Sequence, residues 1–279
     1  NKNKVFLDLA RQYACEVVFF NYPWWKASNE HSEDIINKFR TLFRQYRANL
    51  VHINTIMPIH ALRAANKENI QSILHIREII SKDEALTAYI GYDQNEIINK
   101  VKQYSDYLIA NSRITEKEFL KPGKTRLLYN TIDKDLFSCP LSSTKELRVG
   151  MISSNIPKKG VRDFVKLANE VYRVNKKITF SLVGEHSNLV KELSEEQAQG
   201  LHSPNLLFPG YSSSTIEAIN GLDVICNFSH FAESFGRTIA EGMAAGKVVI
   251  GYEWGALSEL IDHYDTGFLV PYQKPEKAI

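Results

Sequence analysis

The sequence has few cysteines and no long apolar run. Its three cysteines, Cys15, Cys139 and Cys226, are far apart, and none belongs to a C-x-x-C pair or lies near a histidine at metal-ligand spacing. This pattern predicts a reducing, cytoplasmic location and no metal site. Because no run of about 18 apolar residues and no basic-then-apolar signal segment occurs, we expect neither a membrane span nor an export signal. Peripheral association with the inner face of a membrane stays open.

The sequence also lacks an excess of charge of one sign. Its 34 basic and 32 acidic residues nearly cancel, which gives no reason to expect a nucleic-acid partner. No short repeat or low-complexity tract is present. At 279 residues and 44% apolar content, the chain has the composition of a folded protein and is long enough for two ordinary domains.

Short apolar segments alternate with helical patterns through the first half. Strands are predicted at residues 16–21, 49–54, 71–76 and 106–110, and a helix at 34–47. Strands that alternate with helices pair in parallel through crossover connections. Since the apolar runs are continuous, we expect a sheet that is covered on both faces.

A second alternating series follows an aperiodic polar stretch at residues 131–146. It comprises predicted strands at 147–152, 178–184, 205–210, 223–228 and 247–252, with helices at 161–175, 189–199, 214–220 and 236–245 between them. The pattern predicts an α/β protein with two doubly wound parallel sheets. We place the domains at residues 1–138 and 139–279.

Both ends of the sequence look incomplete. The chain opens into an apparent helix at Phe6 without a strand before it, and it stops at Ile279 just after an apparent strand at 267–270. An unpaired edge in a parallel sheet is a liability, so we expect that flanking segments are missing from this sequence.

The strongest local signal lies at residues 228–261, where a strand leads into a polar loop and a short helix. Gly236 is expected to open the helix and Gly246 to close it. The free backbone N–H groups of Gly236, Arg237 and Thr238 would then face the carboxyl end of the sheet, where open α/β folds bind ligands. This is an arrangement that suits a phosphate group.

Two glutamates flank the start of this helix. Glu233 lies in the loop and Glu241 inside the helix, with seven residues between them. Helical rise places their carboxylates roughly 10 Å apart, enough to bracket a diphosphate between a sugar and a ribose. The alternative is a loop carboxylate near the helix dipole and a solvated helix residue.

The run from Glu233 to Glu241 resembles the E-x7-E region of retaining glycosyltransferase family 4, the glycosyl transferases group 1, which have the GT-B fold of two facing Rossmann-like domains. The likeness is weak before residue 100 and strong after residue 145. It extends to further segments that follow the family's usual order, namely 110–112, 128–133, 157–160, 182–185, 205–210 and 266–270.

The resemblance implies a role for each matching residue. Glu233 would contact the transferred sugar, with the backbone of Ser234, Phe235 and Gly236 beside the sugar and diphosphate. Glu241 would hold the ribose hydroxyls. Lys159 would neutralise the leaving diphosphate, although a surface lysine in a turn is the alternative. The donor would be a UDP-type or GDP-type sugar, bound without a metal ion or a resident cofactor.

Several positions depart from the family's pattern. Ser154 stands where the family usually has a phosphate-facing arginine, and Arg237 is a substitute for it. His186 replaces the second glycine of the G-x-G turn that begins at Gly184, and it is interpreted as a surface histidine. Tyr211, after a predicted strand, is placed either beside a nucleotide base or in loop packing.

The first domain offers one candidate side chain for catalysis. Arg77 follows a predicted strand at the position where the family often has a histidine, and a guanidinium there would face a sugar phosphate. The alternative is an ion pair with Glu78 or a neighbour. His52 and Asn54 are weaker candidates for lining the cleft. The family's glycine-rich loop after its first strand is not present.

Together these features predict a retaining enzyme that moves a hexose-type sugar from a nucleotide to a saccharide or lipid-linked acceptor, in cell-surface polysaccharide or glycoconjugate synthesis. A nucleotide-sugar epimerase or a phosphorylase of the same fold remains an alternative. A non-catalytic partner that binds a nucleotide sugar is another.

Overall fold

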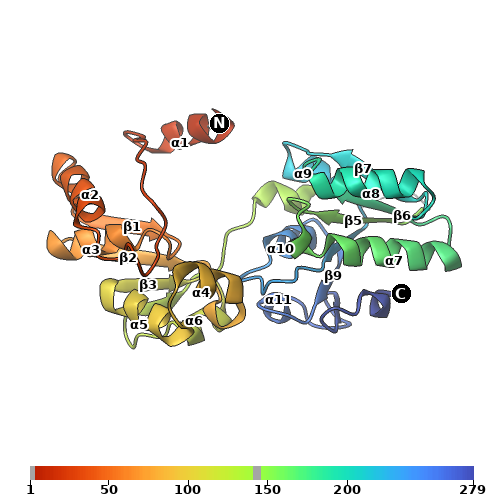
Figure 1. Cartoon of the computed structure of the whole chain (residues 1–279). Helices are drawn as coiled ribbons and strands as arrows, with labels where there is room; N and C mark the ends of the chain where they lie inside the picture. The colour runs from red at the N-terminus through yellow and green to blue at the C-terminus, as the bar shows by residue number, and fades with distance from the viewer. Residues whose placement is uncertain (1–3, 141–145) are drawn as a thin grey trace.

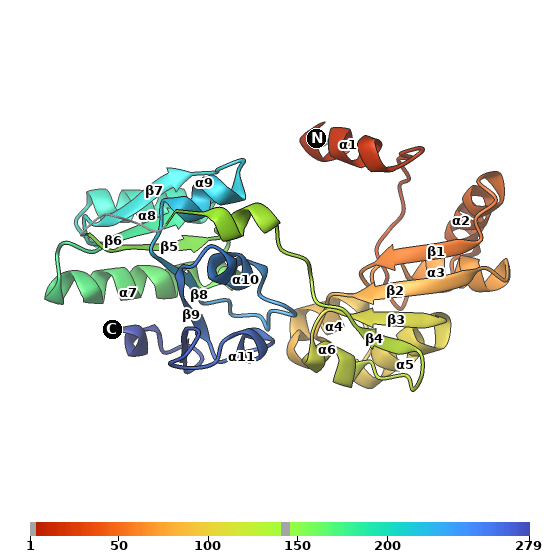
Figure 2. The same cartoon turned by 180° about the vertical axis from the view of Figure 1, so that it is seen from behind.

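The computed structural model describes residues 4–140 and 146–279, which form two lobes joined by an extended segment (Figures 1 and 2). The first lobe contains α1 (Lys4–Tyr13), α2 (Glu33–Gln45), β1 (Leu50–Asn54), α3 (Ile59–Lys67), β2 (Gln71–Ile76), η1 (Ile80–Lys82), α4 (Glu84–Ile90), α5 (Gln94–Tyr104), β3 (Tyr107–Ala110), α6 (Arg113–Glu118) and β4 (Thr125–Leu127).

The second lobe begins after the short helix η2 (Lys134–Ser138). Its elements are β5 (Arg148–Ile152), η3 (Pro157–Lys159), α7 (Val161–Val174), β6 (Thr179–Val183), α8 (Asn188–Ala198), β7 (Leu206–Gly210), α9 (Thr215–Asn220), β8 (Val224–Asn227), α10 (Arg237–Ala244), β9 (Val248–Tyr252), α11 (Leu257–Leu260), β10 (Phe268–Val270) and η4 (Pro275–Ala278).

Each lobe is built on one parallel sheet, which confirms the predicted α/β class. The first sheet has the strand order β1-β2-β3-β4, and the second has the order β10-β9-β8-β5-β6-β7. In the second sheet, β5 pairs with β6 on one side and with β8 on the other, so the strand order reverses between β5 and β8. Loops leave such a reversal in opposite directions and leave a crevice at the carboxyl ends of the two strands.

The second sheet is buried between two layers of helices, as its continuous apolar strands predict. On α7, the apolar residues recur at helical spacing and are buried against the sheet, as Phe164, Leu167 and Val171 illustrate. All four residues of β8 are buried. No helix in the two described ranges has both the length and the apolar character that crossing a bilayer needs.

The first sheet differs from the expectation of two covered faces. Val51 and Ile53 of β1 are buried, whereas Leu50, His52 and Asn54 are exposed on the other face. The polar side chains at alternate positions already mark this face as solvated, and the continuous apolar run was therefore overestimated. The helix predicted at Phe6 is present as α1, which lies apart from the sheet in both views (Figures 1 and 2).

The strand predicted at residues 16–21 is wrong. This segment has no ladder partner and runs as irregular chain. Its aromatic residues are instead held by side-chain packing, because the ring of Phe20 lies 4.7 Å from that of Phe39 on α2 and Tyr22 lies 5.1 Å from the same ring. A short apolar run reports burial, and burial alone does not decide between a strand and packed coil.

The segment between the lobes returns into the second one before β5 begins. Leu136 of η2 is completely buried in a cluster with Ile239 of α10, and Ile132 packs against the same cluster. The domain boundary at residues 138 and 139 stays a prediction, and part of the preceding segment packs with the second sheet.

A carboxylate of the second lobe completes a helix of the first. Glu259 on α11 accepts hydrogen bonds from the backbone N–H groups of Arg113 at 2.7 Å and Ile114 at 2.8 Å, the first two residues of α6. These N–H groups have no partner within their own helix, and a negative charge is favourable at this end. The two lobes therefore share one helix cap.

A buried carboxylate organises the first lobe. Glu30 is completely buried, and its Oε1 accepts hydrogen bonds from Tyr104 at 2.8 Å and Lys100 at 3.1 Å, with Arg63 at 3.4 Å. Burial alone raises the pKa of Glu30, but the hydrogen bonds from Tyr104, Lys100 and Tyr92 outweigh it and bring the pKa below its usual value. The ionised form is thus the stabilising one.

We predict that Glu30→Gln lowers the free energy of unfolding by about 3 kcal/mol, because it leaves two buried cations without a counter-charge. Urea denaturation measures the loss. The matched control is Glu33→Gln, which removes an exposed pair with Lys67 and should cost at most about 0.5 kcal/mol. Since the folded pKa of Glu30 is depressed, its contribution is present at neutral pH and is lost as pH falls from about 5 to about 3. Equal losses in the two variants would contradict this account.

Candidate functional site

A cavity of about 290 Å³ lies at the crevice where the strand order of the second sheet reverses. Ser153 and Ser154 line it just after β5, and Ser229 and Glu233 line it after β8. Thr238, in the first turn of α10, closes another side. The cavity therefore occupies the place where parallel α/β sheets bind their ligands.

The predicted residues Lys159 and Glu233 meet in this cavity. The ammonium group of Lys159 lies 2.9 Å from Glu233 Oε1, and the hydroxyl of Ser229 donates to the same oxygen at 2.8 Å. Both members of the pair are largely shielded, with side-chain exposures of 24% and 17%. The alternative of a surface lysine does not hold, because Lys159 faces the cavity. Ser229 was not predicted, and its place at a strand end is the signal that pointed to it.

A glycine brings Lys159 to this position. Gly160 follows η3 with a φ of 73°, and a side chain there would overlap the carbonyl oxygen of Phe228. Only glycine tolerates both the left-handed backbone and this close approach. The loop after β5 can therefore lie directly against the loop after β8.

Helix α10 begins where the sequence predicts. Gly236 is its N-cap with a φ of 86°, and Arg237 is its first residue. The guanidinium of Arg237 is directed to Glu241, with Nε 2.7 Å from Oε1, so these two candidates form a pair across one helical turn. Glu241 is accordingly not a freely solvated helix residue, since its side chain is only 12% exposed.

The loop before α10 also contacts the first lobe. Ser234 accepts a hydrogen bond from the amide of Asn111 at 2.9 Å, and the ring of Phe235 lies 6.1 Å from that of Tyr129. Asn111 follows β3 and Tyr129 follows β4. Both lie in segments that the sequence singles out, although the contacts themselves were not predicted.

Arg77 lies at the carboxyl end of β2 among polar side chains of the first lobe. Its guanidinium donates to Asn54 at 2.5 Å and to Asn130 at 3.2 Å, while the carboxylate of Glu78 accepts from the backbone N–H of Arg77. In the described part of the chain, the alternative ion pair with Glu78 is therefore not formed. Burial, followed by the charge of Arg77 and the ring of His52, lowers the pKa of His75 to about 4, so this neighbour is neutral at neutral pH.

The remaining two candidates lie farther along the same edge of the second sheet. Gly184 follows β6, and its N–H donates to the carbonyl of Gly210 at 3.0 Å. A side chain at Gly184 would overlap the carbonyl oxygen of Ser153. Tyr211 follows β7 and is 71% exposed, which excludes the alternative that it is packed into the loop.

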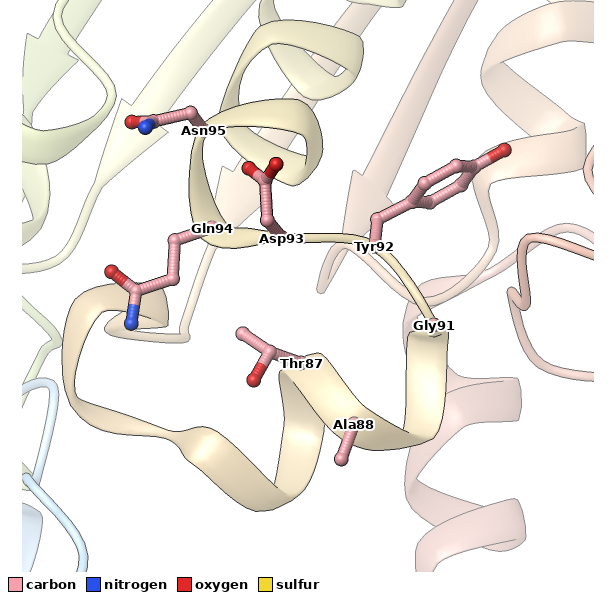
Figure 3. A pocket seen from close by; sticks show the side chains of 7 residues that line it. All are labelled: Thr87, Ala88, Gly91, Tyr92, Asp93, Gln94 and Asn95. Carbon is pink, nitrogen blue, oxygen red and sulfur yellow. The ribbon is translucent and has the colours of Figure 1, made fainter.

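Two further observations bound the site. Within residues 4–140 and 146–279, no group of three or more His, Cys, Asp or Glu side chains is arranged to hold a metal ion. A separate hollow of about 580 Å³ lies at the turn between α4 and α5, where Tyr92 and Gln94 extend in different directions (Figure 3). Its lining includes none of the candidate residues.

Comparison with known proteins agrees with this geometry. Residues 146–279 match the model of the family described as glycosyl transferases group 1. The chain is also similar to the N-acetyl-alpha-D-glucosaminyl L-malate synthase of Bacillus anthracis, with 26% identity over 90% of this chain and 67% of that relative.

Solved structures show the same architecture. Anabaena HepE in complex with UDP superimposes with a TM-score of 0.78 and 22% identity, over 98% of this chain and 77% of that one. A glycosyltransferase from Rickettsia africae gives a TM-score of 0.72 and 17% identity, over 99% of this chain and 75% of that one. TarM gives a TM-score of 0.73 and 15% identity, over 87% of this chain and 49% of that one. The fold is accordingly GT-B, as expected.

We predict that Gly236→Ala lowers the free energy of unfolding by about 3 kcal/mol. The substitution places a side chain at a left-handed φ and overlaps Leu257 of α11, so backbone strain and overpacking add. Thermal or urea unfolding measures the change.

Gly123→Ala is the matched control, because Gly123 has a φ of 71° but nothing within 4 Å of the added carbon. It should cost only about 1 kcal/mol, the strain alone. A cost for Gly236→Ala no larger than that of the control would show that α10 is not seated as described.

Proposed function

We propose that this chain, whose residues 146–279 belong to the glycosyl transferases group 1 family, is a retaining glycosyltransferase that moves a hexose-type sugar from UDP to a saccharide or lipid-linked acceptor. The observation that carries the proposal is the pairing of Lys159 and Glu233 in the switch-point cavity, beside the start of α10. It supplies a cation for a leaving diphosphate and a carboxylate for the sugar in one place.

The charges of this site suit the breaking of a sugar–phosphate bond. As the bond between the anomeric carbon and the diphosphate breaks, negative charge grows on the diphosphate, and Lys159 and the free N–H groups at the start of α10 stabilise it. Glu233 Oε1 already accepts bonds from Lys159 and Ser229, which keeps the carboxylate ionised. An ionised carboxylate stabilises positive charge on the sugar and accepts its hydroxyl hydrogen bonds.

Glu241 is assigned to the ribose hydroxyls and Tyr211 to the nucleobase. Glu241 lies on the same helix as the proposed phosphate site, and its pairing with Arg237 fixes its side chain. Tyr211 presents an exposed ring at the carboxyl edge, where stacking on a base is available. Arg77, held by Asn54 and Asn130, would contact the donor or acceptor from the first lobe.

The choice of UDP over GDP rests on relatives. HepE has been crystallised with UDP, with UDP and glucose, and with UDP-glucose, and S. aureus TarM with UDP and alpha-GlcNAc-glycerol. We extend the UDP preference to this chain. We propose further that transfer needs neither a metal ion nor a resident cofactor, and that it serves cell-surface polysaccharide or glycoconjugate synthesis in the cytoplasm or at the inner face of the membrane.

We predict that UDP stabilises the protein selectively over GDP and ADP. At 100 times its dissociation constant UDP should add about 2.7 kcal/mol to the free energy of unfolding, because it binds only the folded state. A thermal-shift titration measures the effect. Glu241→Ala should abolish most of it by removing the ribose contact.

Glu195→Ala, on the exposed surface of α8, is the control and should leave the UDP response unchanged. A response to UDP that survives in Glu241→Ala would remove Glu241 from the donor site. A larger response to GDP would leave the site in place and change the donor class.

We predict that Lys159→Gln lowers kcat for sugar transfer by about 10²-fold to 10³-fold, because it removes the cation that stabilises the leaving group. Affinity for UDP should fall far less. Lys176→Gln is the control, since Lys176 also lies over an aromatic ring, that of Tyr172, outside the cavity.

Product analysis by NMR completes this test. We expect a glycoside with the anomeric configuration of the donor, formed equally well after EDTA treatment. An inverted product would refute retention, and an epimerised donor or a sugar phosphate would replace glycosyl transfer with another reaction. Near-parental turnover in both Glu233→Gln and Glu241→Ala would overturn the site assignment.

A further inference from the structure

A second cavity, of about 580 Å³, lies between the two lobes. We call it the interlobe groove. The first lobe contributes residues 81–85, which join η1 to α4, and α4 lies at the junction of the lobes in both views (Figures 1 and 2). The second lobe contributes Lys158, His230, Phe231, Trp254 and Tyr272. None of these residues has a role in the donor site described above.

One wall of the groove is a fixed aromatic surface. The rings of Trp254 and Tyr272 stack with centroids 4.7 Å apart and planes 21° apart. The hydroxyl of Tyr272 donates to the carbonyl oxygen of His230 at 2.9 Å, which holds the pair in place. A rigid aromatic face of this kind suits the C–H face of a sugar or a similar hydroxylated compound.

The groove also carries an excess of hydrogen-bond donors. Lys82 lies over the ring of Trp254 at 5.1 Å, and neither Lys82 nor Lys158 forms an ion pair with another described residue. Trp254 Nε1 is buried and has no hydrogen-bond partner in the described chain. A buried N–H without a partner is costly, so a ligand oxygen there would be favourable.

The acidic residues of the groove do not cancel these donors. The carboxylate of Asp83 accepts from the N–H of Leu86 as the N-cap of α4, so it is already engaged. Glu84 is exposed, where water screens its charge. His230 is bonded through Nε2 to Asp163 at 2.7 Å. Two unpaired ammonium groups and one indole N–H therefore define the groove's preference for a negative group.

The groove adjoins the candidate reaction centre. The ring of Phe231 lies beneath both Lys158, at 5.1 Å, and Lys159, at 4.4 Å, and Lys159 in turn contacts Glu233. On the other side, the carbonyl of Glu233 accepts from the N–H of Ala256, two residues after Trp254. A molecule in the groove is thus separated from the donor cavity by the ring of Phe231 and the loop that carries Glu233.

We propose that the interlobe groove is the acceptor subsite and that it selects a hydroxylated acceptor with a carboxylate or phosphate group. The ring or carbon skeleton of the acceptor stacks on Trp254 and Tyr272, while Lys82 and Lys158 bind its anionic group. The name acceptor rests on the proposed function, whereas the selection of an anionic ligand rests on the groove alone. Because the two lysines come from different lobes, such a ligand also bridges the lobes.

Binding of matched probes tests the proposal. Isothermal titration calorimetry at low salt compares methyl β-D-glucuronide with methyl β-D-glucoside, which differ in the carboxylate, and adds glucose 6-phosphate to separate carboxylate from phosphate preference. We expect at least one anionic probe to bind about tenfold more tightly than the glucoside, with an advantage that shrinks as salt is raised.

Variants of the groove locate the binding. Lys82→Gln with Lys158→Gln should remove about tenfold of affinity for the anionic probe and leave the glucoside unchanged. Trp254→Leu should weaken all probes. Lys124→Gln is the control for Lys82→Gln, because Lys124 lies over the ring of Tyr107 at 4.5 Å outside the groove.

Three results would overturn the proposal, namely equal binding of charged and neutral probes, no binding of any probe, or an anionic preference that survives the double lysine variant. UDP titration of the same samples keeps the two proposals apart. If UDP stabilises the double variant normally while the anionic preference is lost, both stand. If UDP has no effect but the anionic preference is present and lysine-dependent, the donor proposal fails and the groove remains an anion-selective site.

Discussion

Parallel strand pairing is the constraint on which this structure depends. Because every ladder is parallel, all strands of a sheet end at the same edge, and the loops that follow them gather there. The reversal of strand order between β5 and β8 then opens a crevice between two of those loops. Lys159 and Glu233 are 74 positions apart in the chain, yet they meet in this crevice. Chemistry at this site follows from topology before any side chain is considered.

The second lobe was predictable because its signals are local. Buried strands and amphipathic helices alternate at lengths that a short window resolves, and Gly236 and Gly246 mark the two ends of α10. The spacing of Glu233 and Glu241 likewise lies within one loop and one helix. Lys159 depended on the family resemblance, and the structure gives its physical basis in the close approach of Gly160 to Phe228. Whether these residues act as assigned stays a prediction.

The rest was out of reach because it depends on contacts between distant segments. The aromatic run that includes Phe20 has the same local character as a strand, and only its packing on Phe39 decides otherwise. The exposed face of β1 depends on what covers it. No local pattern reveals that Asn111 reaches Ser234, or that Lys82 and Trp254 meet between the lobes. These contacts exist only once both sheets are formed and placed side by side.

The helix cap shared by the lobes bears on how such proteins exchange parts. The N–H groups of Arg113 and Ile114 belong to the first lobe, but the carboxylate that accepts from them, Glu259, arrives late in the chain. A chimera joined between the lobes would inherit α6 from one parent and its cap from the other. Lobes therefore recombine without loss only between parents that both carry an acidic side chain at the position of Glu259, or when that segment is transferred together with the first lobe.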